Sequence, residues 1–501
     1  MRTLHLLLAS GVAFLAIGLT SCGVSSVPPI PVGDFNLTIS SQSLFVPIGS
    51  GAGNVQITVQ PTGGFNQAVM VSLSGVPAGV TTTPPSPFTL ARGGSQTVTF
   101  SAPPGTSPSV STITVAGIAR GSETSLYHSG TLSISVADPV YAYAWGGNTI
   151  AAYAVDANTG GITAIGTLAT GLAGGLQFAV TPPRSHFIYF LVETGEGLSI
   201  ATYSADPATG DLTLSQLIPI EASFGVTLVA SPDGKFLYAL GEPFPGASLQ
   251  PGIIIGLQID PATGRLTQSF SEKLPATLGI WSVWYYLVIP FPGNFAYVVT
   301  GGGSFLNSVS PTDGSLSQVS LQDTPIRGEL NGVFSDPLGR ALYSVGVNLG
   351  FIGCTSSVSA LAIDHETGDL RPTASDFTTA ACMDYNNVAF DPDGKYLYIY
   401  ATDGGTLSTI YGFRLDSSSG ALTNLPDSPF AIQGFSDFSP AGSAIAVEPS
   451  QGKLLLRVEG TIQGYRLASY AIDPKSGSLS RLGGPTVPDY VGDLIVVAPK
   501  N

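Results

Sequence analysis

The chain has 501 residues, of which 44% are hydrophobic and only 10% are charged, and its formal net charge is −15. This length can bury more than one core, so more than one domain is expected. The acidic balance excludes nucleic acid as a partner, because phosphates need clustered Lys and Arg side chains. After the N-terminus no stretch keeps a 3.6-residue apolar period, so the predicted fold class is all-β.

The N-terminus has the pattern of an export signal. Arg2 is the only charge before an apolar run over residues 4–19, which could also be a short membrane anchor. The segment Leu19-Thr-Ser-Cys22-Gly resembles a bacterial lipobox. This resemblance implies that residues 1–21 are a lipoprotein signal peptide, that Cys22 is lipidated, and that the protein contacts the cell-envelope membrane (outer membrane or cell surface) only through that lipid. An ordinary signal peptide with an incidental cysteine is the alternative.

Two regions precede the repeated part of the chain. Residues 22–33 are rich in proline and lack a burial pattern, so they are predicted to be a tether. Residues 34–138 alternate apolar and polar residues in short runs between Gly and Pro turns, which predicts an antiparallel β-sandwich. The segment resembles bacterial immunoglobulin-like modules, although the Cys…Trp…Cys pattern of antibody domains is missing. A spacer and an adhesive module are both open as its role.

From residue 140 onward a turn recurs seven times with a period of roughly 50 residues. Its Asp side chain can accept hydrogen bonds from the turn's backbone amides, and a Gly four residues later accepts a positive φ. No EF-type spacing is present, so these carboxylates are predicted to be structural rather than calcium ligands. The copies begin at Asp156, Asp206, Asp260, Ser310, Asp364, Asp416 and Asp473.

A second signature joins an innermost strand (a) to the next strand (b) of each repeat, and strands c and d flank the Asp turn. Clear copies are Ser231–Tyr238, Asp336–Tyr343 and Asp391–Tyr398. Seven such units predict a seven-bladed β-propeller over residues 139–501. The first unit begins at strand b, and residues 493–498 form a strand a with nothing after it, so the C-terminal strand is expected to complete blade one.

With these two motifs, residues 140–501 resemble the seven-bladed lactonase family, which includes bacterial 6-phosphogluconolactonases. The resemblance implies hydrolysis of a lactone, a carboxylic ester. Family enzymes often carry a catalytic His five residues before the proline of the inner-strand motif. The matching residues here are Gln177, Thr227, Tyr286, Gly332, Asn387, Ala444 and Leu494. None is His, so no catalytic residue is assigned and enzymatic activity stays open.

Alternating strands place the b–c and d–a connections on one face, called the top face, and the a–b and c–d turns on the bottom face. The top connections hold many carboxylates and one cation, Arg327, whereas His186, His365 and most Lys and Arg, such as Arg340, fall in bottom turns. Such a top face attracts cations and repels anions. A phosphorylated sugar, which needs cationic groups around its phosphate, is therefore a poor ligand.

Aromatic side chains are expected beside these carboxylates. Trp281 and Trp284 fall in a long d–a connection, and Trp145 ends a strand b at the same face. Aromatic planes next to carboxylates suit sugars or cationic groups, while packing between blades is the alternative. The candidate ligand-binding residues are Glu221, Trp281, Trp284, Arg327, Glu329, Asn331, Asp384, Asp437 and Asp489.

Cys354 and Cys382 both fall in top-face connections, so a disulfide between them is predicted, with two free thiols as the alternative. No metal site and no cofactor are predicted, since no set of His, Cys and Asp has zinc spacing. A divalent cation such as Ca²⁺ has no support in the residue pattern.

Three functions remain open from sequence. The first is non-catalytic binding of a carbohydrate, another small or cationic ligand or a protein partner by the top face. The second is a lactone hydrolase that uses carboxylates, with or without a divalent ion, in place of the family's His. The third is a purely structural component of the cell envelope.

Overall fold

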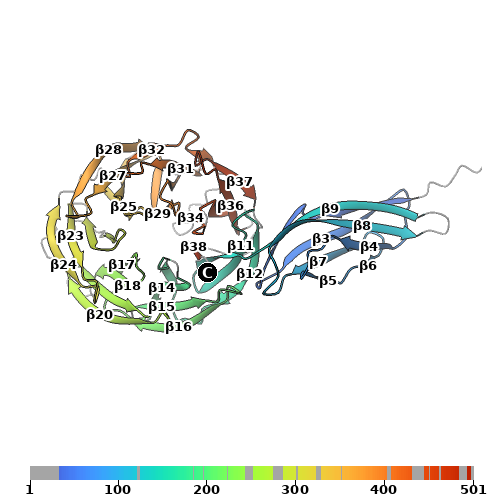
Figure 1. Ribbon diagram of the computed structural model, residues 1–501, viewed down its shortest axis with the longest axis horizontal. Coiled ribbons are helices and arrows are strands. Elements are labelled where there is room, and N and C mark those ends of the chain that lie inside the picture. Colours follow the sequence, from blue (N-terminus) through green and yellow to red (C-terminus); the bar gives the residue numbers. More distant parts are fainter. Residues whose placement is uncertain are drawn as a thin grey trace, which may run out of the picture.

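The computed structural model shows an all-β protein (Figure 1), with no helix among the residues that it describes. None of these residues therefore forms a helix that could cross a membrane. The described residues are 33–120, 125–183, 185–195, 197–222, 224–242, 252–274, 286–300, 303–322, 329–350, 353–402, 408–431, 445–450, 452–461, 464–483 and 493–497.

The first domain is a sandwich of two sheets around one apolar core, which includes Phe35, Ile57, Phe100 and Ile134. Its strands alternate buried and exposed residues because one face of each sheet meets the core. One sheet has the order β1 (Asp34–Ile39), β3 (Gly53–Thr62), β7 (Ser95–Ser101), β5 (Thr81–Thr83). The other has the order β2 (Ser43–Pro47), β9 (Ser125–Ala137), β8 (Ser109–Arg120), β4 (Val69–Ser74), β6 (Phe88–Leu90).

The expectation of an antiparallel sandwich is wrong for one pair of strands and for an isolated parallel bridge between Ile48 and Ala102. Strand β2 pairs with β9 in parallel, with Ser43 opposite Ser133 and Pro47 opposite Ala137. The reason is that the chain passes from β1 in one sheet to β2 in the other, where it lies beside the last strand of the domain.

The second domain contains seven sheets arranged radially as blades (Figure 1). Blades one to three are β38 (Asp493–Val497), β10 (Val140–Gly146), β11 (Thr149–Val155), β12 (Ile162–Ala169); β13 (Leu176–Val180), β14 (Phe187–Thr194), β15 (Gly197–Ala205), β16 (Leu212–Pro219); and β17 (Phe224–Ala230), β18 (Phe236–Glu242), β19 (Ile253–Ile259), β20 (Leu266–Lys273). Each is written from strand a to strand d. Strands b, such as β10 and β14, are buried almost throughout because blades pack face to face.

The remaining blades repeat this order. Blade four is β21 (Tyr286–Val288), β22 (Phe295–Thr300), β23 (Gly303–Val309), β24 (Leu316–Gln322), and blade five is β25 (Glu329–Ser335), β26 (Ala341–Gly350), β27 (Gly353–Ile363), β28 (Leu370–Thr379). Blade six is β29 (Cys382–Phe390), β30 (Tyr396–Thr402), β31 (Ser408–Leu415), β32 (Leu422–Asn424), with β33 (Phe430–Ala431) also paired to β31. Blade seven is β34 (Ile445–Val447), β35 (Leu454–Thr461), β36 (Gly464–Ile472), β37 (Leu479–Gly483).

The C-terminal strand completes blade one. Strand β38 pairs antiparallel with β10, from Trp145 opposite Asp493 to Tyr141 opposite Val497. Each inner strand contacts the inner strands of both neighbouring blades, and β38 lies between β34 and β13. The ring is therefore closed by non-consecutive segments, which leaves no free inner edge between blades one and seven.

A tyrosine on strand b joins each of the first six blades to the next. Its hydroxyl donates to the carbonyl oxygen of the glycine in the next blade's c–d turn, at 2.8 Å for Tyr343 and Gly420. The equivalent pairs are Tyr143 with Gly210, Tyr189 with Gly264, Tyr238 with Gly314, Tyr297 with Gly368, and Tyr398 with Gly477. Burial raises the pKa of these phenols, so they stay neutral donors.

The turn aspartates act within their own turns. The Asp260 carboxylate accepts hydrogen bonds from the backbone amides of Ala262 and Thr263, and Asp473 does the same two and three residues on. Hydrogen bonds from Thr263 hold the pKa of Asp260 below its usual range, and those from Ser476 do so for Asp473. These carboxylates therefore stabilise the c–d turns that the tyrosines contact.

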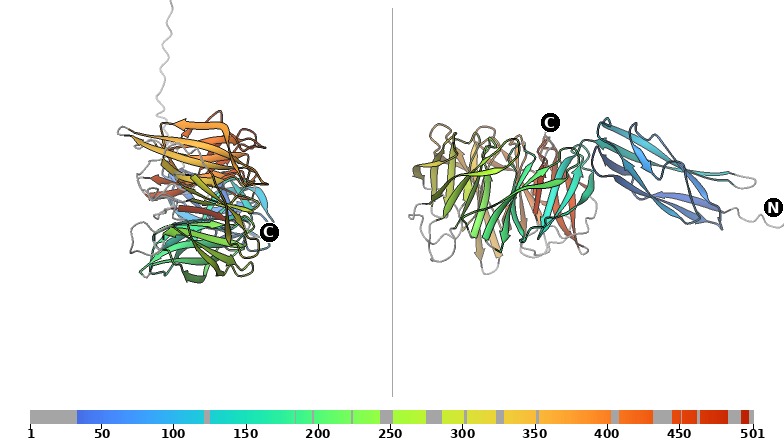
Figure 2. Two further views of the ribbon diagram at one scale, coloured as in Figure 1. Left: turned by 90° about the vertical axis from the view of Figure 1, so that its left-hand side faces the viewer. Right: turned by 90° about the horizontal axis from the view of Figure 1, so that it is seen from below.

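The sandwich is fixed directly against blade one. Phe45 of β2 is 5% exposed and belongs to the apolar cluster that contains Tyr143 and Ile150 of the propeller. The Ser135 hydroxyl donates to Asp156 of the first c–d turn at 2.6 Å, and Thr163 donates to the Phe45 carbonyl at 3.3 Å. Figures 1 and 2 show the sandwich projecting from the rim of the disc beside β11 and β12.

Candidate functional site

The predicted top-face site is described only in part. Trp281, Trp284, Arg327, Asp437 and Asp489 lie outside the described residues, as does Cys22. Glu329 begins β25 and Asp384 lies in β29, where the backbone alone is described. Both strands are innermost strands of adjacent blades, and Glu221 is exposed in the connection that precedes β17.

Asn331 connects two blades. Its side-chain amide donates to the Met383 carbonyl oxygen at 3.1 Å, so it joins strand a of blade five to strand a of blade six. The Met383 backbone amide donates in turn to the Ser356 hydroxyl at 2.9 Å, in the buried space beside strand c. One N–H of the Asn331 side chain thus supports the inner ring through this bond.

The predicted disulfide between Cys354 and Cys382 is confirmed, with Cα atoms 5.4 Å apart. It joins β27 of blade five to β29 of blade six, close to Met383 and Ser356. Strands β26 and β27 have 10 and 11 residues, against 6 and 7 for the equivalent β22 and β23. The disulfide therefore fastens the turn end of a long b–c hairpin, where Cys354 lies opposite Leu349, to the neighbouring inner strand.

One polar pair at the top of blade two was not anticipated from sequence. Gln177 of β13 donates from Nε2 to the Glu193 carboxylate of β14 at 2.6 Å. Gln177 occupies one of the positions at which lactonases often carry His, and both side chains are exposed. The two residues are 16 positions apart in the chain, and the pairing of β13 with β14 brings them together.

The other described positions that match the family's His are sheltered between blades. Asn387 is 2% exposed and Tyr286 is 8% exposed, while Thr227 is half-buried on β17. Gly332 has no side chain to offer. Within the described inner strands, these positions therefore supply no imidazole that could take a proton near neutral pH.

Of the two alternatives for Trp145, exposure at the top face and packing between blades, the structure shows the second. Its side chain is 4% exposed and packs edge-to-face on Phe190 of blade two, with ring centroids 5.2 Å apart. Trp145 lies near the end of β10, but its ring points into the space between blades. Burial of this large apolar ring is more favourable than its exposure to water. It is a core residue.

Arg340 lies in the a–b turn between β25 and β26, and its charge is paired within the protein. Its guanidinium pairs with Asp336 at 2.6 Å, and their side chains are 10% and 0% exposed. It also donates to the carbonyl oxygens of Gly394 and Asp416 in blade six. Arg340 therefore ties the bottom turns of two blades together rather than presenting charge to a ligand.

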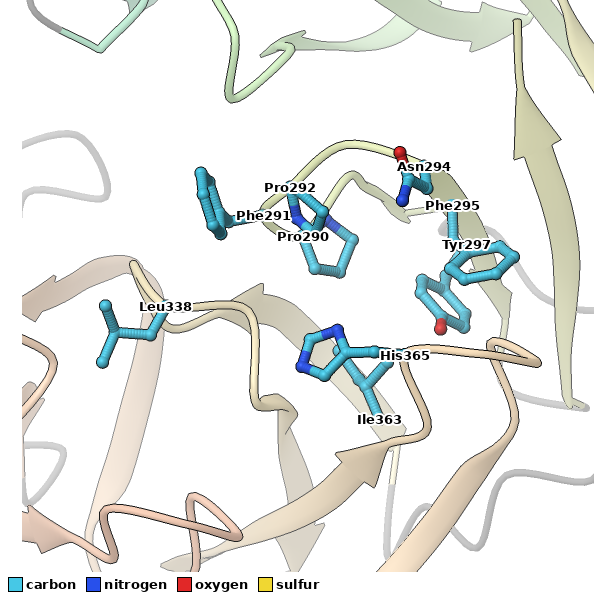
Figure 3. A pocket seen from close by; sticks show the side chains of 9 residues that line it. All are labelled: Pro290, Phe291, Pro292, Asn294, Phe295, Tyr297, Leu338, Ile363 and His365. Carbon is cyan, nitrogen blue, oxygen red and sulfur yellow. The ribbon is translucent and has the colours of Figure 1, made fainter.

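A small pocket of about 320 Å³ lies between the bottom turns of blades four and five. Figure 3 shows His365 on one side of it and Pro290 on the other, with Phe291 and Leu338 at its outer margin. His365 is exposed, and the lining is otherwise mainly apolar. Among the described residues, no three His, Cys, Asp or Glu side chains are close enough to hold a metal ion.

Several solved structures of β-propeller proteins are similar to this chain. A "putative 6-phosphogluconolactonase" from Bacteroides fragilis matches with 16% identity and a TM-score of 0.53, over 72% of this chain and 98% of that one. A protein from Lactobacillus plantarum matches with 16% identity and a TM-score of 0.52, over 72% and 99%. At this identity the likeness shows the fold, which is that of a lactonase-like β-propeller. No sequence profile of a known family matches the chain, and no curated protein matches it.

Proposed function

We propose that this protein is an exported lipoprotein whose propeller is a non-catalytic binding module, with the acidic, aromatic top face as its binding surface. A carbohydrate, a cationic ligand or a protein partner fits such a surface, because carboxylates attract cations and aromatic planes stack on sugars and cationic groups.

The hydrogen bond between Gln177 and Glu193 carries the proposal. Its length is 2.6 Å, and its donor is the neutral amide of Gln177. Lactonases often carry their catalytic His, the general base, at this position. An amide cannot accept a proton near neutral pH, so this residue can orient or bind but cannot act as a general base. The amide donor of Asn331 is likewise used within the protein.

A glycan and peptide array tests this proposal. The double variant Trp281→Ala/Trp284→Ala is compared with wild type and with Tyr127→Ala, which removes an aromatic side chain that is 58% exposed on the sandwich. We expect the double variant to lose at least tenfold in affinity for at least one ligand that wild type binds, and Tyr127→Ala to bind every ligand normally. Equal binding by all three proteins excludes the top-face aromatics from the function.

The second candidate function is hydrolysis of a lactone. It is supported by the fold that the chain shares with proteins described as 6-phosphogluconolactonases. Because the top face is acidic, the substrate would be an unphosphorylated aldonolactone, and a carboxylate such as Glu329 would replace the base. Turnover is measured with and without Ca²⁺ or Mn²⁺. Activity that disappears in Glu329→Gln but not in the exposed outer-strand variant Glu272→Gln contradicts the binding-only proposal.

The sandwich is proposed to hold the propeller away from a lipid-bearing N-terminus. Asp34 accepts a 2.8 Å hydrogen bond from His128 near the start of β9, and Ala137 at the other end of β9 leads into the propeller. At roughly 3.3 Å per residue, these nine steps separate Asp34 from the propeller by about 30 Å. Incorporation of labelled palmitate by wild type but not by Cys22→Ala is expected. Equal labelling of the two proteins rules out Cys22 as the lipid site.

A further inference from the structure

A groove lies at the junction between the sandwich and blade one, beside the first c–d turn. Its volume is about 670 Å³, and both domains contribute to its walls. We call it the junction groove. The residues on which the argument depends are Ser43, Asn54, Val110, Ser133, Thr163 and Leu482.

The walls of the junction groove are held in place by the protein itself. Phe45 is inserted into the propeller's apolar cluster, and Thr163 donates to its carbonyl oxygen at 3.3 Å. Ser135 donates to the buried Asp156 at 2.6 Å. A groove whose walls are already fixed costs little conformational entropy when a ligand enters it.

The chemistry of the groove is neutral. Apart from the buried Phe45, its lining residues carry hydroxyl, amide, backbone and aliphatic groups, and among these described residues there is no charged side chain. A charged ligand would lose hydration there without gaining an opposite charge, which is costly. A ligand rich in hydroxyl groups can instead exchange its hydrogen bonds to water for hydrogen bonds to the walls.

Two hydroxyls lie side by side on one wall. Ser43 and Ser133 are direct partners in the parallel pairing of β2 and β9, and both are exposed. Neighbouring strands are about 4.8 Å apart, so the two hydroxyls can contact adjacent hydroxyl groups of one sugar ring. Asn54 adds an amide, whose oxygen accepts a 2.7 Å hydrogen bond from Thr99 and whose nitrogen is thereby oriented as a donor.

Two exposed apolar side chains complete the pattern. Val110 is 73% exposed and Leu482, from blade seven, is 45% exposed, and both line the groove. Exposed aliphatic groups of this size beside paired hydroxyls match a sugar, which has an apolar C–H face and polar edges. We propose that the junction groove is a second binding site, specific for a neutral oligosaccharide that contacts both domains.

Calorimetric titration of the full chain with maltotriose, cellotriose and xylotriose tests this proposal, with trigalacturonate as the charged probe. We expect at least one neutral probe to bind, and Ser133→Trp to weaken its binding at least tenfold by filling the groove. The matched control Ser129→Trp changes an exposed serine on the same strand, about 13 Å away at 3.3 Å per residue, and should bind as wild type. Thermal unfolding of both variants checks that they fold.

The proposal is overturned if none of the three neutral probes binds, if trigalacturonate binds as well as they do, or if Ser133→Trp binds normally. Should Ser133→Trp fold poorly, Val110→Asp at its 73% exposed position introduces a charge into the groove and should weaken binding by the same order. The Trp281→Ala/Trp284→Ala variant should retain this binding. Its loss there would assign the sugar to the top face and contradict the junction site.

Discussion

The Ser469 hydroxyl donates a 2.8 Å hydrogen bond to the Gly160 carbonyl oxygen, across the joint between blades seven and one. The other six joints use a tyrosine of strand b for this bond. Blade seven has Leu456 where that tyrosine would be, and Leu456 lies directly opposite Ser469 in the pairing of β35 with β36. A hydroxyl from strand c therefore replaces the missing phenol, and the contact is kept at all seven joints of the ring.

Removal of one of these hydroxyls should destabilise the propeller. Tyr343→Phe leaves the buried Gly420 carbonyl without its 2.8 Å donor, so we expect the free energy of unfolding to fall by about 1–3 kcal/mol. Ser469→Ala should have an effect of the same order. Urea unfolding measures both, with Tyr127→Phe on the exposed sandwich surface as the control. An unchanged midpoint in both variants contradicts a stabilising role for these bonds.

The glycine of the c–d turn should not tolerate a side chain. Gly264 has φ of 68°, and a Cβ there would overlap the ring of Phe187 in the preceding blade. Gly264→Ala should therefore lower the free energy of unfolding by more than the ~1–2 kcal/mol that a left-handed backbone alone costs a residue with a side chain. Gly147→Ala, at φ 57° with open space around it, isolates the backbone cost, and Gly166→Ala has neither penalty. The unfolding midpoint should be highest for Gly166→Ala, lower for Gly147→Ala and lowest for Gly264→Ala. Equal losses of stability in Gly147→Ala and Gly264→Ala would exclude a contribution from the contact with Phe187.

Stability should decrease in acid. Hydrogen bonds from turn residues lower the folded-state pKa of Asp260, Asp364 and Asp473 below the usual value of an aspartate. An acid with a depressed folded pKa contributes stability that is present above its unfolded pKa and is lost as pH falls through the folded value. Buried Asp391, whose pKa is raised mainly by desolvation, opposes this trend. We expect Tm to fall from pH 5 to pH 2, and Asp260→Asn/Asp473→Asn to show a smaller fall. An identical pH dependence in that variant would mean that other groups control acid unfolding.

Deletion of residues 493–501 should open the ring. Strand β38 supplies five register pairs to β10, and without it the backbone groups of that edge of β10 lose their partners. We expect faster proteolysis and concentration-dependent association of the truncated chain, measured by sedimentation. A truncated chain that stays monomeric and as resistant to protease as the full chain would show that β38 is dispensable.

The orientation of the sandwich should depend on Phe45. Its side chain is 5% exposed and packs in the apolar cluster that contains Tyr143 and Ile150. Phe45→Ala should therefore lower the free energy of unfolding by roughly 3–5 kcal/mol and loosen the junction between the domains. Small-angle scattering should show a broader distribution of distances between the domains. Phe88→Ala, a half-buried change confined to the sandwich, should leave that distribution unaltered. If both variants scatter like wild type, the junction is held by other contacts.

The repeated architecture could be predicted from short segments of sequence. The c–d turn is encoded within five residues, because an aspartate such as Asp260 bonds amides two and three positions on and Gly264 supplies the positive φ. Seven such turns, separated by apolar strands, are sufficient to predict a seven-bladed propeller. The disulfide between Cys354 and Cys382 could be predicted for a similar reason, since they are 28 residues apart in adjacent blades.

The side-chain contacts across blades and domains could not be predicted from the sequence, because they depend on the tertiary structure. Ser469 and Gly160 are 309 positions apart, and Gln177 meets Glu193 only through the register of two strands. Trp145 has the same local sequence environment whether its ring faces solvent or Phe190, and burial between blades determines the outcome. A local turn depends on residues that are neighbours in the chain. These contacts depend instead on how seven separate blades pack into a closed ring, which no short segment of sequence specifies.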